Sequence, residues 1–134
     1  MTPNTETTEK SVLKDATVLV VEDNVSNFVL IARMLGYLGI HCEWKTSGYE
    51  VVEYADTLPR LDLVLMDIRM PVMGGYEATS KIRQFNKDII ILAQTAYAQS
   101  GDREKAIEAG CNDYISKPID TNLLYKLIKK HINK

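Results

Sequence analysis

The chain has 134 residues, a length that fits one domain, and 46% of its residues are hydrophobic, which is enough to form a core. Its net charge is −2, so no overall basic field favours nucleic acid as a partner. No apolar run reaches the length of a membrane span and the amino terminus lacks the pattern of a signal peptide, so we expect a cytoplasmic location and no membrane contact.

Residues 1–14 are polar and rich in threonine, and we expect them to be a flexible tail or the remnant of a linker before one domain at residues 15–134. In that domain, short segments rich in apolar or β-branched residues alternate with amphipathic segments. This alternation is typical of an α/β fold in which helices cover both faces of a parallel sheet. The expected strands are residues 17–21, 41–45, 61–66, 89–94 and 113–116.

Several residues mark where the intervening helices should begin and end. Ser47 and Glu50 have the spacing of a capping box, which predicts a helix directly after the second strand. Gly39 and Gly110 stand where helices should end, and Asp120 is placed to cap the last helix. These signals support five helices, one after each strand.

Polar side chains stand at the carboxyl ends of the expected strands, where ligands bind in open α/β sheets. They bring three acids, a hydroxyl and an ammonium to one edge of the sheet. The residues are Glu22 and Asp23 after the first strand, Asp67 after the third, Thr95 after the fourth and Lys117 after the fifth.

Three acids at one edge are unfavourable without a cation, because two unit charges about 4 Å apart repel by roughly 4 kcal/mol at an effective dielectric constant near 20. Carboxylates, a carbonyl and water suit Mg²⁺, which also binds phosphate oxygens. Lys117 offers a positive charge to a phosphoryl oxygen, and Thr95 offers a hydrogen bond. The nucleophile in such a site is a carboxylate, and its attack on phosphorus forms an aspartyl phosphate.

Four motifs at these strand ends resemble those of response-regulator receiver domains, over about residues 15–134. They are VVEDN (20–24), LMDIRMPVMGG (65–75), QTA (94–96) and DYISKPID (113–120). Each motif is weak alone, but four in the correct order are highly specific. The segment GDREKAIEAGCNDYISKPID is most similar to receivers of hybrid sensor histidine kinases. The resemblance implies a flavodoxin-like (βα)5 three-layer sandwich with a parallel five-stranded sheet in the order 2-1-3-4-5.

The resemblance also implies a role for each residue of the acidic edge. Asp67 should accept the phosphoryl group from a phosphohistidine. Asp23 and Asp67 should hold Mg²⁺ together with the backbone carbonyl of Arg69, and Glu22 should act directly or through water. Lys117 should contact Asp67 at rest and the phosphoryl group afterwards.

A second group of residues should respond to phosphorylation. By the same resemblance, Thr95 should move onto a phosphoryl oxygen and Tyr114 should turn inward into the vacated space, as the two-state element of the domain. Simple edge packing is the alternative role for Tyr114. The peptide bond between Lys117 and Pro118 should be cis, as in the family.

The sequence departs from the family pattern at several positions. Arg69 and Tyr97 are bulky and stand where receivers flank the path of the hydrolytic water, so we expect a long-lived phosphoryl group. Gln94 replaces a residue that is usually aliphatic, and it needs hydrogen-bond partners if it is buried.

The first helix is apolar on two faces, so it is either buried twice or docks a partner. One stripe should face the sheet and contains Leu30, Ile31, Met34, Leu35 and Leu38. We expect the second stripe to receive a helical partner that carries a histidine, with loose surface apolarity or a dimer contact as the alternative. This second stripe contains Val25, Phe28, Val29 and Ala32.

The leading hypothesis is a phosphoacceptor module of a two-component phosphorelay, most similar to the receiver of a hybrid histidine kinase. Its partners would be a histidine kinase, a histidine phosphotransfer domain, or both. A stand-alone response regulator and a pseudo-receiver scaffold are the alternatives. A haloacid-dehalogenase-type hydrolase is disfavoured, because Arg69 stands where such enzymes have a second acid. We expect a monomer without enzymatic activity beyond its own phosphorylation and dephosphorylation, unless the chain is a fragment of a hybrid kinase.

Overall fold

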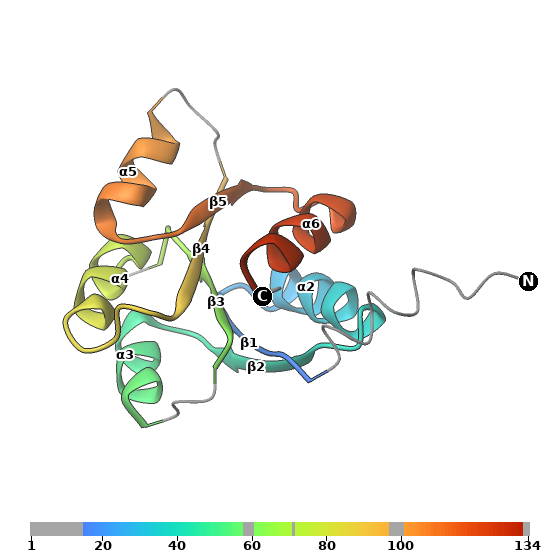
Figure 1. Cartoon of the computed structure of the whole chain (residues 1–134), viewed down its shortest axis with the longest axis horizontal. Helices are drawn as coiled ribbons and strands as arrows, with labels where there is room; N and C mark the ends of the chain where they lie inside the picture. The colour runs from blue at the N-terminus through green and yellow to red at the C-terminus, as the bar shows by residue number, and fades with distance from the viewer. Residues whose placement is uncertain (1–14, 58–60, 71, 97–100, 133–134) are drawn as a thin grey trace, which may run out of the picture.

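The computed structural model describes residues 15–57, 61–70, 72–96 and 101–132 (Figure 1). The expected tail at residues 1–14 and the side chain of Tyr97 lie outside these residues. Strands and helices alternate along the described chain, as expected. The elements are β1 (Thr17–Val21), α2 (Val25–Tyr37), β2 (His41–Lys45), α3 (Gly48–Thr57), β3 (Leu63–Asp67), α4 (Gly75–Arg83), β4 (Ile90–Thr95), α5 (Asp102–Ala109), β5 (Asp113–Ser116) and α6 (Thr121–Ile132).

The five strands form one parallel sheet in the order β2-β1-β3-β4-β5, which confirms the expected fold class and strand order. Each strand begins and ends within two residues of its expected position. The central strand, β3, is buried along its whole length, and its last residue, Asp67, pairs in register with Gln94 of β4. Cys42 in β2 and Cys111 just before β5 lie at opposite edges of the sheet, and both are free thiols.

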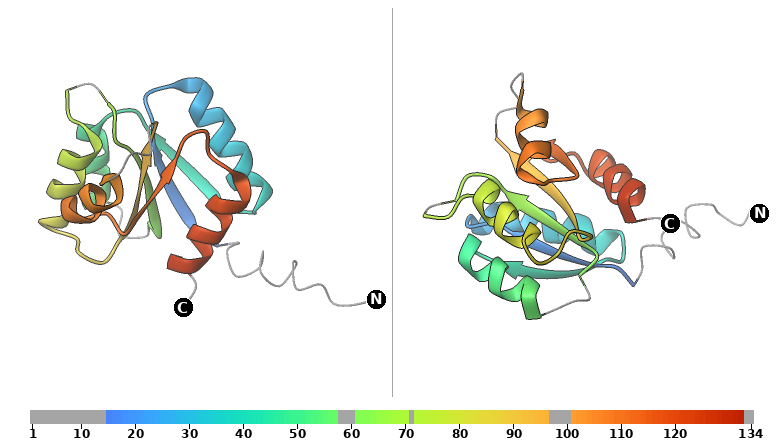
Figure 2. Two further views of the ribbon diagram at one scale, coloured as in Figure 1. Left: turned by 90° about the horizontal axis from the view of Figure 1, so that it is seen from above. Right: turned by 60° about the vertical axis from the view of Figure 1, so that its left-hand side comes forward.

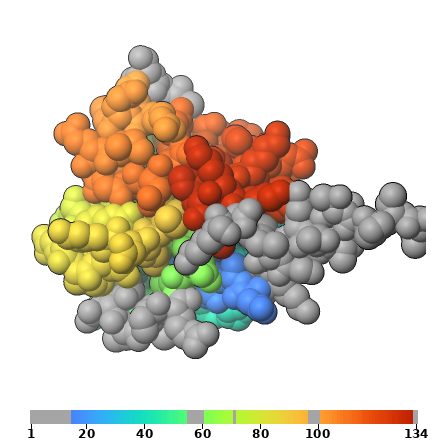
Figure 3. Space-filling view, in the orientation of Figure 1, coloured from blue at the N-terminus to red at the C-terminus, as the bar shows by residue number. Residues whose placement is uncertain are grey.

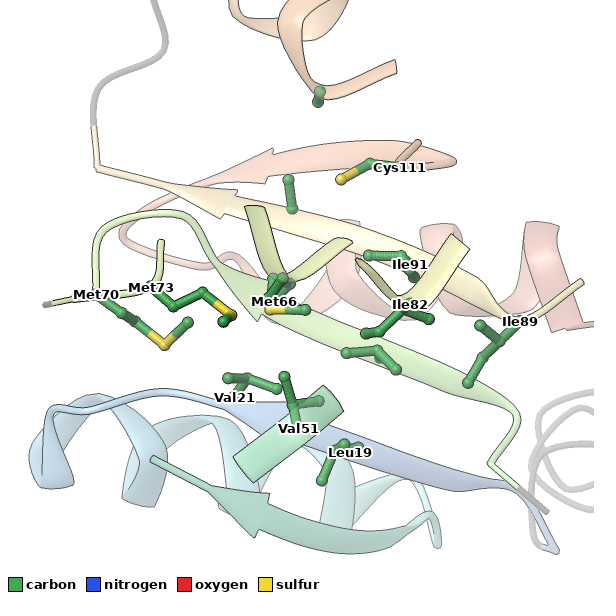
Figure 4. Packing of buried hydrophobic residues seen from close by; sticks show 14 residues of the cluster. Leu19, Val21, Val51, Met66, Met70, Met73, Ile82, Ile89, Ile91 and Cys111 are labelled. Atoms are coloured by element: carbon green, nitrogen blue, oxygen red, sulfur yellow. The ribbon is translucent and has the colours of Figure 1, made fainter. Parts of the chain in front are cut away.

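Helices α3, α4 and α5 cover one face of the sheet, and α2 and α6 cover the other (Figures 1 and 2). Successive side chains of each strand point to opposite faces, so every central strand contributes to both cores. Val21 and Met66 pack with Val51 of α3 and Ile82 of α4 in the first core (Figure 4). Burial on both sides explains why β3 is apolar at each position before Asp67.

Helix α2 packs on the sheet through a stripe that differs from the expected one. Ile31 and Leu35 are buried as expected, but Leu30 is 55% exposed, so its expected place against the sheet was wrong. Phe28, which was expected on the outer stripe, instead stacks on Trp44 of β2 with ring centroids 4.1 Å apart. The indole on the edge strand covers one face of the Phe28 ring, so Phe28 is partly buried while Leu30 is exposed.

The helix ends follow the expected signals. Ser47 accepts a hydrogen bond from the Glu50 backbone N–H at 3.2 Å, and α3 begins at Gly48. The Glu50 carboxylate accepts from the N–H and hydroxyl of Thr46, and a smaller contribution from the Ser47 N–H, the second bond of a capping box, also lowers its pKa. Asp120 caps α6 by accepting from the N–H groups of the second and third residues beyond it.

One buried carboxylate connects α5, β5 and α6. Asp113, at the start of β5, contacts Arg103 of α5 at 2.7 Å and His131 and Lys130 of α6 at 3.3 and 3.6 Å. In the space-filling view the chain from α5 through β5 to α6 forms one continuous surface (Figure 3). Burial raises the pKa of Asp113, but the Tyr114 N–H, the His131 ring and the two cations outweigh it and hold this pKa below its usual value. The ion pairs fasten both helices to an edge strand.

No described helix has both the length and the hydropathy of a transmembrane span.

Candidate functional site

Three acidic side chains meet at the carboxyl ends of β1 and β3. One carboxylate oxygen from each of Glu22, Asp23 and Asp67 lies within 4.8 Å of the other two. Glu22 and Asp67 are buried, and Asp23 is exposed. The register of the sheet places β1 beside β3, so the chain brings these acids together across 44 positions of sequence through strand pairing. The expected acidic cluster is therefore present.

Asp67 is held by the backbone that follows it. Its Oδ1 atom accepts a hydrogen bond from the Arg69 N–H at 3.1 Å. Gly75, the first residue of α4, packs directly on the peptide that follows Asp67. A β-carbon at Gly75 would overlap the Asp67 carbonyl oxygen and lie 2.8 Å from the Ile68 Cα. Gly75 thus serves close packing at this position.

Lys117 joins the two buried acids. Its Nζ atom lies 3.2 Å from Glu22 and 3.4 Å from Asp67, as expected for a resting contact with Asp67. The Lys117 N–H also donates to the Thr95 carbonyl at 2.7 Å, and the Lys117–Pro118 peptide bond is cis. The sequence indicated the contact with Asp67 but not the pair with Glu22.

The site carries an excess of negative charge. One ammonium faces three carboxylates, and only one of the three is exposed. Burial, and then the negative charge of Glu22, raise the pKa of Asp67 from 3.8 to about 6, although Lys117 acts in the opposite direction. A divalent cation that binds hard oxygen ligands would relieve this repulsion. The residues present therefore fit a metal such as Mg²⁺ by both charge and donor type.

The two expected switch residues lie on adjacent strands. Thr95 ends β4, and Tyr114 lies in β5 next to Ala93 of β4. Tyr114 is partly buried against the core that α3, α4 and α5 cover. Arg69, two residues beyond Asp67, is exposed at the same edge of the sheet, whereas Tyr97 lies outside the described residues.

The outer surface of α2 adjoins this site. Of the expected docking stripe, Val25 and Val29 are 61% and 41% exposed, Ala32 is half-buried, and Phe28 is covered in part by Trp44. Leu30 is exposed as well. It lines a cavity of about 90 Å³ between α2 and the loop before α6, together with Asn27, Ile31, Met34, Gln94, Lys117, Pro118 and Ile119.

Gln94 lies fully buried at the floor of this cavity. Its Nε2 atom donates to the Leu65 carbonyl at 3.4 Å, and its Oε1 atom has no hydrogen-bond partner. The sequence identified the position as unusual, but the orphaned oxygen depends on the packing around it.

Comparison with known proteins gives the family that the four sequence motifs resemble. The model of the response regulator receiver domain matches residues 18–129, and this chain belongs to that family. The signal transduction histidine-protein kinase BarA of Escherichia coli is 39% identical over 117 residues, which are 86% of this chain and 13% of the relative. This chain thus spans a small part of the curated relative that it matches.

Two solved structures are also similar. The receiver domain of the sensor histidine kinase PA1611 from Pseudomonas aeruginosa, solved with a magnesium ion in its active site cleft, is 38% identical with a TM-score of 0.82, over 90% of this chain and 99% of that one. The second is a co-crystal structure of the histidine phosphotransfer protein Ypd1 with the receiver domain of Ssk1, from Saccharomyces cerevisiae. It gives 33% identity and a TM-score of 0.83, over 90% of both chains.

Proposed function

We propose that this receiver domain takes a phosphoryl group from a phosphohistidine onto Asp67. The observation that carries the proposal is a buried carboxylate at the end of a buried strand, beside two further acids and the Lys117 ammonium. In the transfer, a bond forms between an Asp67 oxygen and phosphorus as the bond from phosphorus to the histidine nitrogen breaks. The imidazole leaves with its electron pair.

The other residues of the site position and neutralise the group that is transferred. Asp23, Asp67 and the Arg69 carbonyl would hold Mg²⁺, with Glu22 acting directly or through water. When bound, this ion supplies positive charge to the phosphoryl oxygens. Lys117 would turn from Asp67 to a phosphoryl oxygen, because the new group carries more negative charge than the carboxylate.

Thr95 and Tyr114 would convert phosphorylation into a change of surface. The Thr95 hydroxyl would donate to a phosphoryl oxygen, and Tyr114 would then turn inward. Adjacent strands carry the two residues, and the partial burial of Tyr114 at rest supports this coupling.

The direct test is Mg²⁺-dependent labelling of the purified chain with acetyl phosphate. The wild type should become labelled, and removal of the metal with a chelator should abolish the label. Asp67→Asn should remain unlabelled. A wild type that takes no label in Mg²⁺ would refute the proposal.

We further propose that the domain acts in a phosphorelay of the hybrid-kinase type, with a histidine kinase or a histidine phosphotransfer domain as partner. The similarity to BarA and to the Ssk1 receiver supports this context. Cytoplasmic location and a monomeric state remain predictions of the sequence.

The partner would dock on the outer face of α2, over the stripe of Val25, Phe28, Val29 and Ala32. The exposure of Val25 and Val29 supports this surface. Exposed Leu30 extends it toward Lys117 and Pro118, in the loop before α6. Val29→Glu should slow phosphotransfer from a histidine phosphotransfer protein while labelling by acetyl phosphate stays normal. Leu123→Glu, at a similarly exposed leucine of α6, is the matched control. Equal transfer rates for both variants would exclude this face.

Arg69 and Tyr97 would slow the loss of the phosphoryl group by covering the approach of water. The exposed position of Arg69 beside Asp67 supports its part in this. The phosphorylated chain should lose its label slowly in Mg²⁺, and Arg69→Ala should shorten the lifetime severalfold. Decay of the wild type within seconds would contradict the proposal.

A further inference from the structure

Trp44 contacts the acidic edge of the sheet from the neighbouring edge strand. It lies in β2 beside Val20 of β1, and its indole Nε1–H donates to the backbone carbonyl of Glu22 at 2.8 Å. Its ring stacks face to face on Phe28, with an angle of 3° between the two planes. The stacked phenyl group therefore fixes the indole in the orientation that this hydrogen bond needs.

The bond acts on the peptide group that leads into Asp23. The Glu22 carbonyl and the Asp23 N–H belong to one planar unit, so holding the carbonyl also fixes the direction in which the chain enters Asp23. Asp23 lies beyond the last residue of β1, where strand pairing no longer directs the backbone. Its side chain is exposed, so packing does little to orient its carboxylate.

The remaining polar atoms of Glu22 are engaged elsewhere. Its N–H donates to the Lys45 carbonyl at 3.0 Å, and its carboxylate receives the Lys117 ammonium and the Asn24 N–H, each at 3.2 Å. These bonds hold the strand and the Glu22 side chain. The indole of Trp44 holds the peptide on the Asp23 side.

We propose that Trp44 is a positioning residue of the metal site, which keeps the peptide between Glu22 and Asp23 in the orientation that brings the Asp23 carboxylate to Glu22 and Asp67. The inference rests on the proposed Mg²⁺ site. Trp44 acts through the backbone and contributes no ligand atom. Without its N–H, the segment carrying Asp23 would sample more orientations, and part of the binding energy of the ion would be spent on ordering it.

The test is Trp44→Phe in the full chain, which keeps an aromatic ring beside Phe28 and removes the N–H donor together with the pyrrole part of the indole. One neutral hydrogen bond typically changes an equilibrium by about threefold to tenfold, so the Mg²⁺ dissociation constant from calorimetric titration should rise by about that factor. Ile128→Val is the control, because it removes a methyl group from the core under α6, far from Glu22 in the fold. It should lower stability to urea without changing the Mg²⁺ dissociation constant.

A kinetic measurement separates positioning from general loosening of the fold. Labelling by acetyl phosphate should need more Mg²⁺ in Trp44→Phe, yet reach the wild-type rate at saturating Mg²⁺. A variant that is merely damaged would stay slow at every Mg²⁺ concentration.

The wild type offers a readout that needs no variant, because the chain has a single tryptophan. Its fluorescence, or the nuclear magnetic resonance signal of its indole N–H, should change saturably with Mg²⁺ and give the calorimetric dissociation constant. Equal Mg²⁺ dissociation constants for the wild type and Trp44→Phe would overturn the positioning role alone. An indole signal that stays unchanged when Mg²⁺ binds would do the same. A wild type that binds no Mg²⁺ would overturn the proposed metal site itself.

Discussion

Asp67 combines deep burial with a negative charge, and its surroundings explain how the chain can hold both. The residue is 3% exposed and shares its site with buried Glu22, so its ionised form is unfavourable. Lys117 and the Arg69 N–H offset part of that cost. The cost that remains would be relieved by a bound cation. The same negative charge that destabilises the metal-free domain thus favours metal binding.

This conflict predicts an unusual dependence of stability on pH in the absence of metal. The pKa of Asp67 is about 6 in the folded chain against 3.8 as its ordinary value, so the folded state binds more protons between these values. Its contribution to stability is therefore favourable below about pH 4 and is lost as the pH rises through about 6. Asp67→Asn should accordingly be about 1 to 3 kcal/mol more stable than the wild type near pH 7, and the difference should shrink toward pH 4.

Urea unfolding of both proteins with a chelator present, at several pH values, checks this expectation. Saturating Mg²⁺ should stabilise the wild type and reduce the advantage of the variant. A wild type more stable than Asp67→Asn near pH 7 without metal would contradict the account of Asp67.

Gln94 provides a second residue whose burial conflicts with its chemistry. Its Oε1 atom is fully buried without a partner, and such an atom costs about 1 to 3 kcal/mol. Gln94→Leu should therefore raise the free energy of unfolding by about 1 kcal/mol, since the lost bond from Nε2 to the Leu65 carbonyl is long at 3.4 Å. Thermal or urea unfolding measures the change. A clear loss of stability would mean that Gln94 has a partner that compensates its burial.

At the scale of elements, the turn from β3 into α4 holds the backbone of Asp67 in place at the end of its strand. Gly75→Ala should cost about 1 to 3 kcal/mol of stability, because its methyl group would overlap the Asp67 carbonyl. It should also slow labelling of Asp67, since relief of the overlap moves that residue. Gly74→Ala is the matched control: its β-carbon would lie 3.3 Å from the nearest atom, the Ile68 carbonyl oxygen, and should cost less than about 1 kcal/mol. Equal effects of the two substitutions on stability and labelling would exclude this role of Gly75.

The same elements show what sequence could and could not predict. Asp67 was identifiable because a buried strand is apolar along its length and then ends at a carboxylate, and Thr95 and Lys117 because they stand at the ends of the next two expected strands. Strand order followed from resemblance to a family. The face of α2 that packs on the sheet was harder to predict, because α2 has two apolar stripes. Which of them is buried depends on the side chains of the neighbouring strand. Trp44 made Phe28 the better-packed residue and left Leu30 outside.

Contacts made with backbone atoms left no pattern to detect. The bond from Trp44 to the Glu22 carbonyl joins residues 22 positions apart, and any residue at position 22 would present the same carbonyl. The close approach of Gly75 to the Asp67 peptide is similar, since a glycine pair predicts a turn without saying what lies against it.

At the scale of the whole molecule, the sheet separates two kinds of surface. The α2 face carries exposed apolar residues beside the acidic edge and suits a partner that delivers the phosphoryl group. The opposite core holds Tyr114, and its strand is joined through Asp113 to α5 and α6. A change at Thr95 and Tyr114 would therefore reach α5, which covers the opposite face, and α6, which shares the face of α2 but packs beside β5 at the far edge of the sheet.

The central claim is that Asp67 forms the acyl phosphate, and identifying the modified atom tests it most directly. The chain is treated with acetyl phosphate and Mg²⁺, reduced with borohydride so that a phosphorylated aspartate becomes homoserine, and mapped by peptide mass spectrometry. The account predicts homoserine at position 67 and at no other aspartate, with none when Mg²⁺ is withheld. Conversion at Asp23 in place of Asp67, or no conversion in Mg²⁺, would contradict it.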